Sequence, residues 1–535
     1  MTAESTPLAA TVELPSGGTG RLRDLPWEAL LVGLGLFAVL AAFVAADPTS
    51  RATASFAPFT DEAFNLANAR NFVQLGHWST DEWNLYLVNL PFSLIEAAWL
   101  KLVGVGIVQA RLVSIVCVSL TATALVWGIR GILGRAVATF CGVAFAASGL
   151  ILFYGRLAFL EDLVVLGITL GTLVLARQDR PGLRGGAVSG LCYAVAIGTK
   201  PNALFSVVGI LLALGLIWGW RDSGVRRWVA GASAVIAVAG LLWAIVIWLP
   251  NGAAVAVDIK IWPPYQWNLT PDALVRSIKD YLTGSNDYLF GFILLPLIVL
   301  SAAGAVAIAA LRKRLDETES RLAAAAFAWA AFGFGIMMLV SYRPNRYVVP
   351  LVPAMAILAA IGLHLVVGWL RDKLAAGAAP DETAVTTTEA AAPPSEVPPA
   401  AQRSRGAPMR RAAPNLLIGA VLIAAAVPGL AWYGRWAGSA TYDLVVIQNQ
   451  FADAVPAGQV VAGRDVALFL MRSKATTTIV GLANTGDLYA EGVRWYLEPS
   501  DAGAPAGVSG TAWSSKERVM CATYGSTTEC LFHVR

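Results

Sequence analysis

The chain has 535 residues, of which 57% are hydrophobic and only 14% are charged, and its mean hydropathy is +0.62. Soluble domains are about 45–50% apolar and about 25% charged, so this composition excludes a set of water-soluble domains and predicts a protein embedded in a lipid bilayer. The formal net charge is +4, and the basic residues lie in short segments between apolar runs. A nucleic-acid-binding surface is therefore excluded.

Apolar runs that approach the length of a membrane span recur along the chain, and we count about eleven of them. They lie near Leu25–Ala46, Gln109–Ile129, Val137–Tyr154, Leu163–Ala176, Gly186–Gly198, Leu204–Trp220, Trp228–Leu249, Leu289–Leu311, Leu322–Val340, Tyr347–Leu370 and Leu416–Trp432. A further run, Val88–Val103, is assigned to the outer interface, because counting it as a span would exchange the two sides of most later loops. The predicted fold is an all-α polytopic membrane protein with a small α/β domain at its C-terminal end.

The distribution of Lys and Arg predicts the orientation of the chain. With the N-terminus inside, roughly twenty basic residues lie in cytoplasmic segments, against about a dozen in the outer loops before the C-terminal domain. We therefore expect a multi-pass protein of the plasma (inner) membrane with a cytoplasmic N-terminus and an extracytoplasmic C-terminal domain. Four cations, Arg156, Lys200, Arg343 and Arg346, lie on the outer side against this rule, and each needs a reason to be there.

Composition shifts along the chain predict its domain organisation. The expected parts are a cytoplasmic tail at 1–24, a transmembrane body at 25–370 with outer loops at 47–108 and 250–288, a linker at 371–414, a final span at 415–436 and an extracytoplasmic domain at 437–535. The cytoplasmic linker is rich in Ala, Pro, Thr and Glu and cannot bury a core, so it is expected to be disordered. The last domain has strand-like runs at Gln459–Ala462, Thr477–Val480, Arg494–Leu497 and Arg518–Thr523 and a helix-like run at Val466–Arg472.

The five cysteines form two groups. Cys117, Cys141 and Cys192 lie inside apolar runs and are expected to be packing residues. Cys521 and Cys530 flank a turn-rich stretch between two strand-like runs, where a disulfide across a hairpin is predicted for an extracytoplasmic domain; two reduced thiols are the alternative. No cysteine pair has zinc-site spacing and the chain has only 3 His, which argues against a His-based metal cluster.

Two pairs of adjacent carboxylates are the candidate catalytic residues. Asp61 and Glu62 begin a segment, Phe59–Phe72, with the apolar spacing of an amphipathic helix on the membrane surface. A carboxylate held there can act as a general base, although an acidic pair also simply favours the positive end of a helix. Glu161 and Asp162 lie where a loop enters an apolar run. Such a pair is costly unless it is ion-paired, hydrated or bound to a metal.

The alternatives for the second pair are a salt bridge to Arg156 or a role as metal ligand or acceptor-orienting group in an outer cavity. The cations Lys200, Arg343 and Arg346 interrupt or begin apolar runs. Arg suits bidentate phosphate recognition and Lys supplies a point charge, whereas snorkelling to lipid headgroups is the simpler explanation of each. Carboxylates and phosphate-suited cations on one face predict a reaction on a lipid-linked phosphate.

These motifs together resemble the GT-C membrane glycosyltransferases. The resemblance rests on an Asp-Glu pair after the first span, Arg156-Leu-Ala with an acidic residue three positions after the Ala, the Lys200-Pro interruption, and Arg346-Tyr347 followed by Pro350 and Pro353. It covers roughly 25–370 and is strongest to the protein O-mannosyltransferase and lipid A aminoarabinose transferase branch. The linker and the C-terminal domain lie outside it.

The resemblance implies transfer of a hexose or pentose from a polyprenyl-phosphate donor to an outer acceptor, usually with inversion. Asp61 would be the general base, with Glu62 beside it. Glu161 stands where the family commonly has Asp, and Asp162 follows one residue later, so which of them acts is left open. The cations that would hold the donor phosphate are Arg156, Lys200, Arg343 and Arg346, and Tyr347 would add a hydrogen bond.

A metal ion is not assigned by these residues. Many relatives have His-Pro-Pro after the first acidic pair, whereas this chain has Asn89-Leu-Pro-Phe92, and His77 is the only imidazole nearby. No cofactor is identified with certainty, and a divalent metal ion stays open. The expected partners are the polyprenyl-phosphate sugar and membrane lipid, with a protein, lipid or glycan acceptor. The alternatives are a lipid or solute transporter with an outer anion-capturing site, and a membrane scaffold that presents the C-terminal domain.

Overall fold

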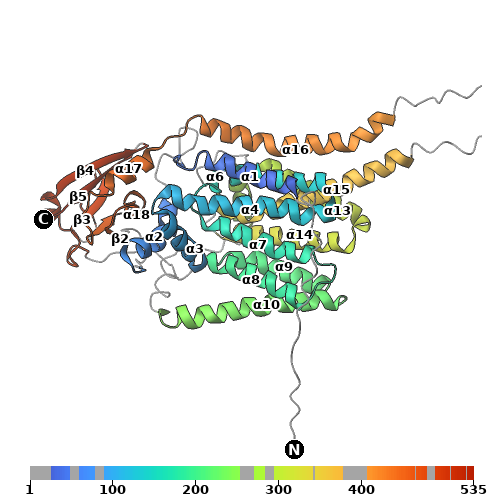
Figure 1. The fold of residues 1–535 in the computed structure, drawn as a ribbon, viewed down its shortest axis with the longest axis horizontal. Coiled ribbons are helices and arrows are strands. Elements are labelled where there is room, and N and C mark those ends of the chain that lie inside the picture. The colour runs from blue at the N-terminus through green and yellow to red at the C-terminus, as the bar shows by residue number, and fades with distance from the viewer. Residues whose placement is uncertain are drawn as a thin grey trace, which may run out of the picture.

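The structure is a computed structural model that describes residues 26–48, 60–78, 89–252, 270–283, 294–340, 344–376, 407–463, 465–478, 488–505, 508–525 and 527–535. Its main body is a bundle of apolar helices that lie side by side along one direction (Figure 1). The sheet of the C-terminal domain lies at one end of this bundle, and two short helices, α2 and α3, lie beside it.

The bundle is built from helices of very different length. They are α1 (Trp27–Ala41), α4 (Ile107–Leu133), α5 (Arg135–Ala146), α6 (Gly149–Tyr154), α7 (Leu160–Ala176), α8 (Leu183–Thr199), α9 (Ala203–Ile217), α10 (Ser223–Trp243) with the π-helix η2 (Ala244–Trp248), α12 (Pro271–Thr283), α13 (Leu295–Leu311) with the 3₁₀ turn η3 (Arg312–Arg314), α14 (Glu317–Leu339), η4 (Asn345–Leu351), α15 (Val352–Ala376) and α16 (Ala407–Ala437). Each predicted apolar run coincides with one of these helices over most of its length. The run Val137–Tyr154 is divided, because α5 ends at Ala146 and α6 begins at Gly149.

Six of the described helices are long and apolar enough to cross a bilayer. They comprise Ile107–Leu133, Ser223–Trp248, Leu295–Arg314, Glu317–Leu339, Asn345–Ala375 and Ala413–Ala437. Three shorter apolar helices, α1, α5 and α9, add to them. The prediction of a multi-pass helical membrane protein is confirmed, whereas the count of about eleven spans stays a prediction.

Local sequence explains several helix ends in the bundle. Gly134 has a φ of 80°, a left-handed conformation that favours glycine, and it ends α4 and begins α5. Asp316 and Glu319 form a capping box at the start of α14, in which each side chain accepts from the backbone N–H of the other. Gly304 on α13 and Gly362 on α15 lie against each other without room for a side chain, so these two helices pack closely, as small residues allow in membranes.

Helices α2 (Thr60–Leu75) and α3 (Leu90–Val103) follow α1 in the chain. The helix predicted over Phe59–Phe72 is present as α2, and much of it is covered by other parts of the protein, while its place on the membrane surface stays a prediction. Leu66 and Ala69 are fully buried, and so are the polar residues Asn68 and Arg70. The helix lies between the bundle and the C-terminal domain, whose segment around α18 contacts it. The run predicted at the outer interface, Val88–Val103, forms α3 from Leu90 onwards.

The described part of the C-terminal domain has one mixed sheet and three short helices. The elements are α17 (Asp443–Phe451), β1 (Val460–Gly463), α18 (Val466–Phe469), β2 (Thr476–Thr478), β3 (Trp495–Pro499), α19 (Gly510–Ser514), β4 (Glu517–Tyr524) and β5 (Thr527–His533), and the strand order is β2-β1-β3-β5-β4. β1 is parallel to β2 and β3, and β5 is antiparallel to β3 and β4. The disulfide joins Cys521 to Cys530 across the β4–β5 hairpin, as predicted, and the α/β character of the domain agrees with expectation.

The linker predicted at 371–414 is helical at both ends. α15 continues to Ala376 and α16 already begins at Ala407, so the first and last residues of the predicted linker belong to these helices. Polar residues at the end of a long helix extend it without cost in water, which hydropathy alone does not register. The residues between these helices lie outside the described part of the chain.

Candidate active site

The site centres on an ion pair between Asp61 and Arg346. Asp61 lies in the first turn of α2, and Arg346 lies in η4, the 3₁₀ segment that precedes α15. Arg346 Nη1 is 3.1 Å from Asp61 Oδ2. The Asp61 side chain is 34% exposed and that of Arg346 only 10%, so the carboxylate is the solvent-accessible member of the pair.

A second carboxylate, Glu161, joins the same group of charges. It lies in the first turn of α7, and its Oε1 contacts the ammonium group of Lys200, which follows the end of α8. The same oxygen is 3.9 Å from Arg346 Nε. Glu161 is almost fully buried, with its side chain 1% exposed. Two cations and two carboxylates, contributed by four separate elements, therefore form one charge-balanced cluster.

The aromatic ring of Tyr347 lies close to both cations. Lys200 Nζ is 4.3 Å from the ring centroid and Arg346 Cζ is 5.6 Å from it, distances at which a cation is attracted by the ring face. Tyr347 is itself buried in the bundle core. The ring thus supports the ends of two long, flexible side chains in one place.

Asp162 does not belong to this cluster. It is fully buried, and neither of its carboxylate oxygens has a hydrogen-bond partner among the described residues. Adjacent residues on a helix are turned by about 100° from each other, so when Glu161 contacts the cations its neighbour faces a different side. Between the two acidic residues that the sequence left open, the geometry favours Glu161.

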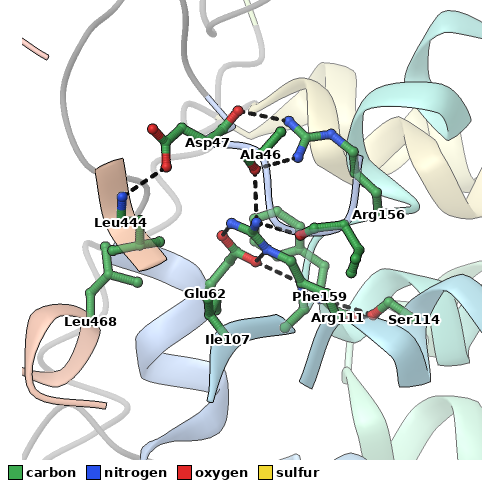
Figure 2. Close-up of polar contacts among 12 residues, drawn as sticks. Ala46, Asp47, Glu62, Ile107, Arg111, Ser114, Arg156, Phe159, Leu444 and Leu468 are labelled. Atoms are coloured by element: carbon green, nitrogen blue, oxygen red, sulfur yellow. Dashed lines mark hydrogen bonds and ion pairs between the residues drawn. The ribbon is translucent and has the colours of Figure 1, made fainter. Parts of the chain in front are cut away.

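Glu62 has a different environment from Asp61. Its two carboxylate oxygens accept from Arg111 Nε at 2.8 Å and Arg111 Nη2 at 2.7 Å, and Glu62 Oε1 also accepts from the backbone N–H of Ala158 at 2.9 Å. Both side chains are fully buried. Arg111 Nη1 further donates to the carbonyls of Val44 and Ala46, each at 2.8 Å. Figure 2 shows this ion pair, which joins α2 to α4, and the contact of Arg111 with Ala46 in the turn after α1.

Arg156, predicted to contact the donor phosphate, is likewise occupied elsewhere. It is fully buried, and its guanidinium donates to the carbonyls of Ala46 at 2.8 Å and Asp47 at 3.1 Å (Figure 2). Its Cζ lies 3.9 Å from the ring centroid of Trp436, at the end of α16. The structure therefore brings Asp61, Glu161, Lys200, Arg346 and Tyr347 together and places Glu62, Asp162 and Arg156 around them. Arg343 lies outside the described residues.

The chemistry of the cluster fits an anionic ligand better than a metal ion. Within the described ranges no group of three or more His, Cys, Asp or Glu side chains is arranged to hold a metal. Both carboxylates of the cluster already face a Lys or Arg cation, which would compete with a divalent ion for the same oxygens. The cations, in contrast, can exchange a carboxylate for a phosphate oxygen.

Arg111 is the polar residue that sequence reasoning missed. It lies in the predicted span Gln109–Ile129, and a charge within a membrane helix is a functional or structural signal by default. The signal was therefore present as a lone Arg near the start of an apolar run. Its partner could not be read from the sequence, because Glu62 lies on another helix.

The helical body, with this cluster at the end next to the C-terminal domain, has a GT-C-like fold, as comparison with solved structures shows. No family model and no curated protein sequence matches it. Among solved structures, it is similar to ArnT from Cupriavidus metallidurans bound to undecaprenyl phosphate, with a TM-score of 0.59 and 17% identity over 94% of this chain and 97% of that one. The structure of the same ArnT in the apo state gives a TM-score of 0.58.

A second neighbour is the archaeal oligosaccharyltransferase AglB from Archaeoglobus fulgidus, solved with an inhibitory peptide and a dolichol-phosphate. The TM-score is 0.51 and the identity 10%, over 87% of this chain and 69% of that one. Both neighbours are members of the GT-C superfamily. The GT-C-like fold implied by the sequence motifs is thereby confirmed.

Proposed function

We propose that this protein is an inverting glycosyltransferase that moves a sugar from a polyprenyl-phosphate donor to an acceptor hydroxyl on the outer face of the plasma (inner) membrane. The observation that carries the proposal is the convergence of Asp61, Glu161, Lys200 and Arg346 at one end of a GT-C-like body. The neighbour ArnT was solved with undecaprenyl phosphate and AglB with a dolichol-phosphate, which supports a donor of this lipid class.

Asp61 is the base in this proposal, because it is the accessible carboxylate of the cluster. It takes the proton of the acceptor hydroxyl while the hydroxyl oxygen attacks the anomeric carbon of the sugar. The bond between the anomeric carbon and the phosphate oxygen breaks, and its electron pair leaves with the polyprenyl phosphate. Attack from the side opposite the leaving group inverts the configuration at the anomeric carbon.

Lys200 and Arg346 bind the phosphate and stabilise the negative charge that develops on it as the leaving group. Preorganised cations in a dry site are worth several kcal/mol in such a step. Glu161 and the ring of Tyr347 hold both cations at one place. Arg343, three residues before Arg346 in the chain, is proposed as a further phosphate contact.

Glu62 and Arg156 act structurally in this proposal. Each is fully buried and bound to groups outside the cluster. Glu62 pairs with Arg111, which donates a hydrogen bond to the carbonyl of Ala46, and Arg156 donates to the same carbonyl. Ala46 precedes the segment that leads to α2. Their function is to fix where that segment begins.

The test is sugar transfer by purified protein in lipid nanodiscs with labelled polyprenyl-phosphate mannose and polyprenyl-phosphate arabinose, and with solubilised envelope fractions as acceptor source. We expect transfer by the wild type, a loss of at least about a hundredfold in kcat for Asp61→Asn, and weak binding of polyprenyl phosphate for Arg346→Ala. Asp453→Asn, an exposed carboxylate of the C-terminal domain, is the matched control and should behave as the wild type.

Full activity of Asp61→Asn would remove Asp61 as the base. A folded, inserted wild type that transfers neither a hexose nor a pentose would contradict the proposal and favour the transporter alternative. That alternative expects charges near the membrane midplane, whereas the cluster lies at the end of the bundle next to the C-terminal domain.

A further inference from the structure

The C-terminal domain is joined to α2, the helix that carries Asp61, through a buried arginine. Arg70 lies on α2 and is fully buried. Its Nε donates to the carbonyl of Met471 at 3.2 Å, and its Nη2 donates to the carbonyls of Leu470 at 3.1 Å, Ser473 at 2.5 Å and Ala475 at 2.7 Å. All four acceptors belong to the segment that follows α18 and leads into β2.

No carboxylate pairs with Arg70 among the described residues, although Nη1 donates to Asn71 Oδ1 at 2.6 Å. The charge is therefore compensated by oxygen dipoles, chiefly those of one short backbone segment. Burial lowers the pKa of Arg70 to about 10, so the guanidinium stays charged at neutral pH. A buried charge whose hydrogen bonds are satisfied by one neighbouring segment ties the two segments together firmly.

Apolar packing continues across the same contact. Leu66 of α2 belongs to one buried cluster with Phe92 of α3 and with Phe451, Leu468 and Phe469 of the C-terminal domain. The first two elements of the outer region and the last domain of the chain therefore share a single core. A domain that is merely tethered to a membrane body does not share its core with that body.

Two further polar contacts hold the domain to the body near the site. The carboxylate of Asp47 accepts from Thr441 Oγ1 at 2.6 Å and from the backbone N–H groups of Asp443 at 2.8 Å and Leu444 at 3.1 Å, and Figure 2 shows the contact with Leu444. At the start of α4, the N–H of Ile107 donates to the Gln448 side chain at 3.4 Å. These contacts place the domain, while Arg70 joins it to α2 through buried hydrogen bonds.

We propose that the C-terminal domain is a working part of the active site and that Arg70 is a positioning residue, which holds α2 in the orientation that brings Asp61 to Arg346. Glu62 fixes α2 to the bundle beside Asp61, and Arg70 fixes it about two turns later. One anchor fixes a point on a helix, whereas two anchors fix its direction and rotation. Both are needed because a catalytic group misplaced by about 1 Å loses on the order of a hundredfold in rate.

This inference rests on the proposed function only where the experiment measures kcat, because only kcat requires sugar transfer. The cations that bind the donor phosphate, Lys200 and Arg346, lie on other elements. Loss of Arg70 therefore lowers turnover without weakening the binding of the lipid phosphate. A residue with a merely structural role would instead lower the yield of folded protein and leave the kcat of the folded fraction unchanged.

The experiment compares Arg70→Met and Arg70→Lys with the wild type in nanodiscs. The matched control is Gln74→Ala, because Gln74 Nε2 makes an exposed hydrogen bond at 3.2 Å to the carbonyl of Arg472, between the same two segments. Three quantities are measured: kcat with the two labelled donors, affinity for polyprenyl phosphate alone, and hydrogen exchange of the α2 backbone amides.

We expect Arg70→Met to lower kcat by at least about tenfold, to keep the affinity for polyprenyl phosphate within about twofold, and to speed amide exchange in α2. Arg70→Lys should lie between Arg70→Met and the wild type, and Gln74→Ala should equal the wild type. If Arg70→Met does not accumulate, Arg70→Lys decides by the same criteria.

Unchanged kcat, a parallel loss of lipid-phosphate affinity, or unchanged exchange in α2 would each overturn the inference. If the wild type transfers no sugar, the proposed function fails, but the exchange and affinity measurements still decide whether Arg70 positions α2. The two failures are therefore distinguishable.

Discussion

Arg346 and Asp61 meet at 3.1 Å, although Arg346 lies just before α15 and Asp61 lies in α2, far earlier in the chain. The contact joins α2 to η4 at the end of the body next to the C-terminal domain. It also sets one cation against the carboxylate proposed as the base. In the proposed reaction the donor phosphate replaces Asp61 as the ion-pair partner of the Arg346 guanidinium. The Asp61 carboxylate is then free to accept a proton.

The two adjacent acids on α7 should differ sharply in their effect on activity. Glu161→Gln removes the charge that orients Lys200 and Arg346, so we expect kcat/KM to fall by about tenfold or more. Asp162→Asn changes a buried side chain outside the cluster and should leave kcat/KM within about threefold of the wild type. Steady-state kinetics on equal amounts of folded protein checks both, and the reverse order would assign the catalytic role to Asp162.

Donor binding should weaken on the alkaline side because of Lys200. Burial lowers the pKa of this ammonium group in the turn between α8 and α9, and the charge of Glu161 opposes part of that shift. Since only the protonated form attracts a phosphate, affinity falls as pH rises through a pKa below that of free lysine. The guanidinium of Lys200→Arg has a higher intrinsic pKa than the ammonium group, so the affinity of this variant should persist to higher pH. A profile of polyprenyl-phosphate binding against pH that is identical for both proteins would contradict this assignment.

The buried pair of Glu62 and Arg111 should act through stability. Glu62→Ala leaves the Arg111 guanidinium buried without its carboxylate, and breaking a buried pair in this way costs about 3–5 kcal/mol. The double variant Glu62→Leu with Arg111→Met removes both charges and should recover most of that loss. Denaturant or thermal unfolding in detergent measures it. A Glu62→Gln protein with wild-type stability and a hundredfold lower kcat would instead show that Glu62 is catalytic.

The disulfide between Cys521 and Cys530 should stabilise the C-terminal domain. It closes a short loop across the β4–β5 hairpin, and a loop of this size is worth about 2–3 kcal/mol in the chain-entropy treatment. The double variant Cys521→Ser with Cys530→Ser should unfold at correspondingly lower denaturant. Cys117→Ser, at a buried free cysteine in α4, serves as control for loss of a thiol. No change on removal of the disulfide would mean that the hairpin is held by its neighbours alone.

Much of the helical body could be predicted from the sequence, because hydropathy and length determine which segments enter a bilayer. The strands β1, β3 and β4 were also near their predicted places, since alternation and turn residues are local signals. The exposure of α2 was not predictable. The sequence predicts an amphipathic surface helix there, whereas the structure buries Asn68 and Arg70 under a domain that begins more than three hundred residues later in the chain.

The candidate site divides in the same way. Sequence motifs alone selected Asp61, Glu161, Lys200, Arg346 and Tyr347 by residue type, order and expected sidedness, and composition alone determined that the protein is a helical membrane protein. Only the tertiary structure decided that Glu161 rather than Asp162 contacts the cations, and that Glu62 and Arg156 hold backbone. It also decided that Arg70 binds the C-terminal domain. The physical reason is that a side chain's chemistry is a local property, whereas its partner is set by the packing of helices that are distant in the chain.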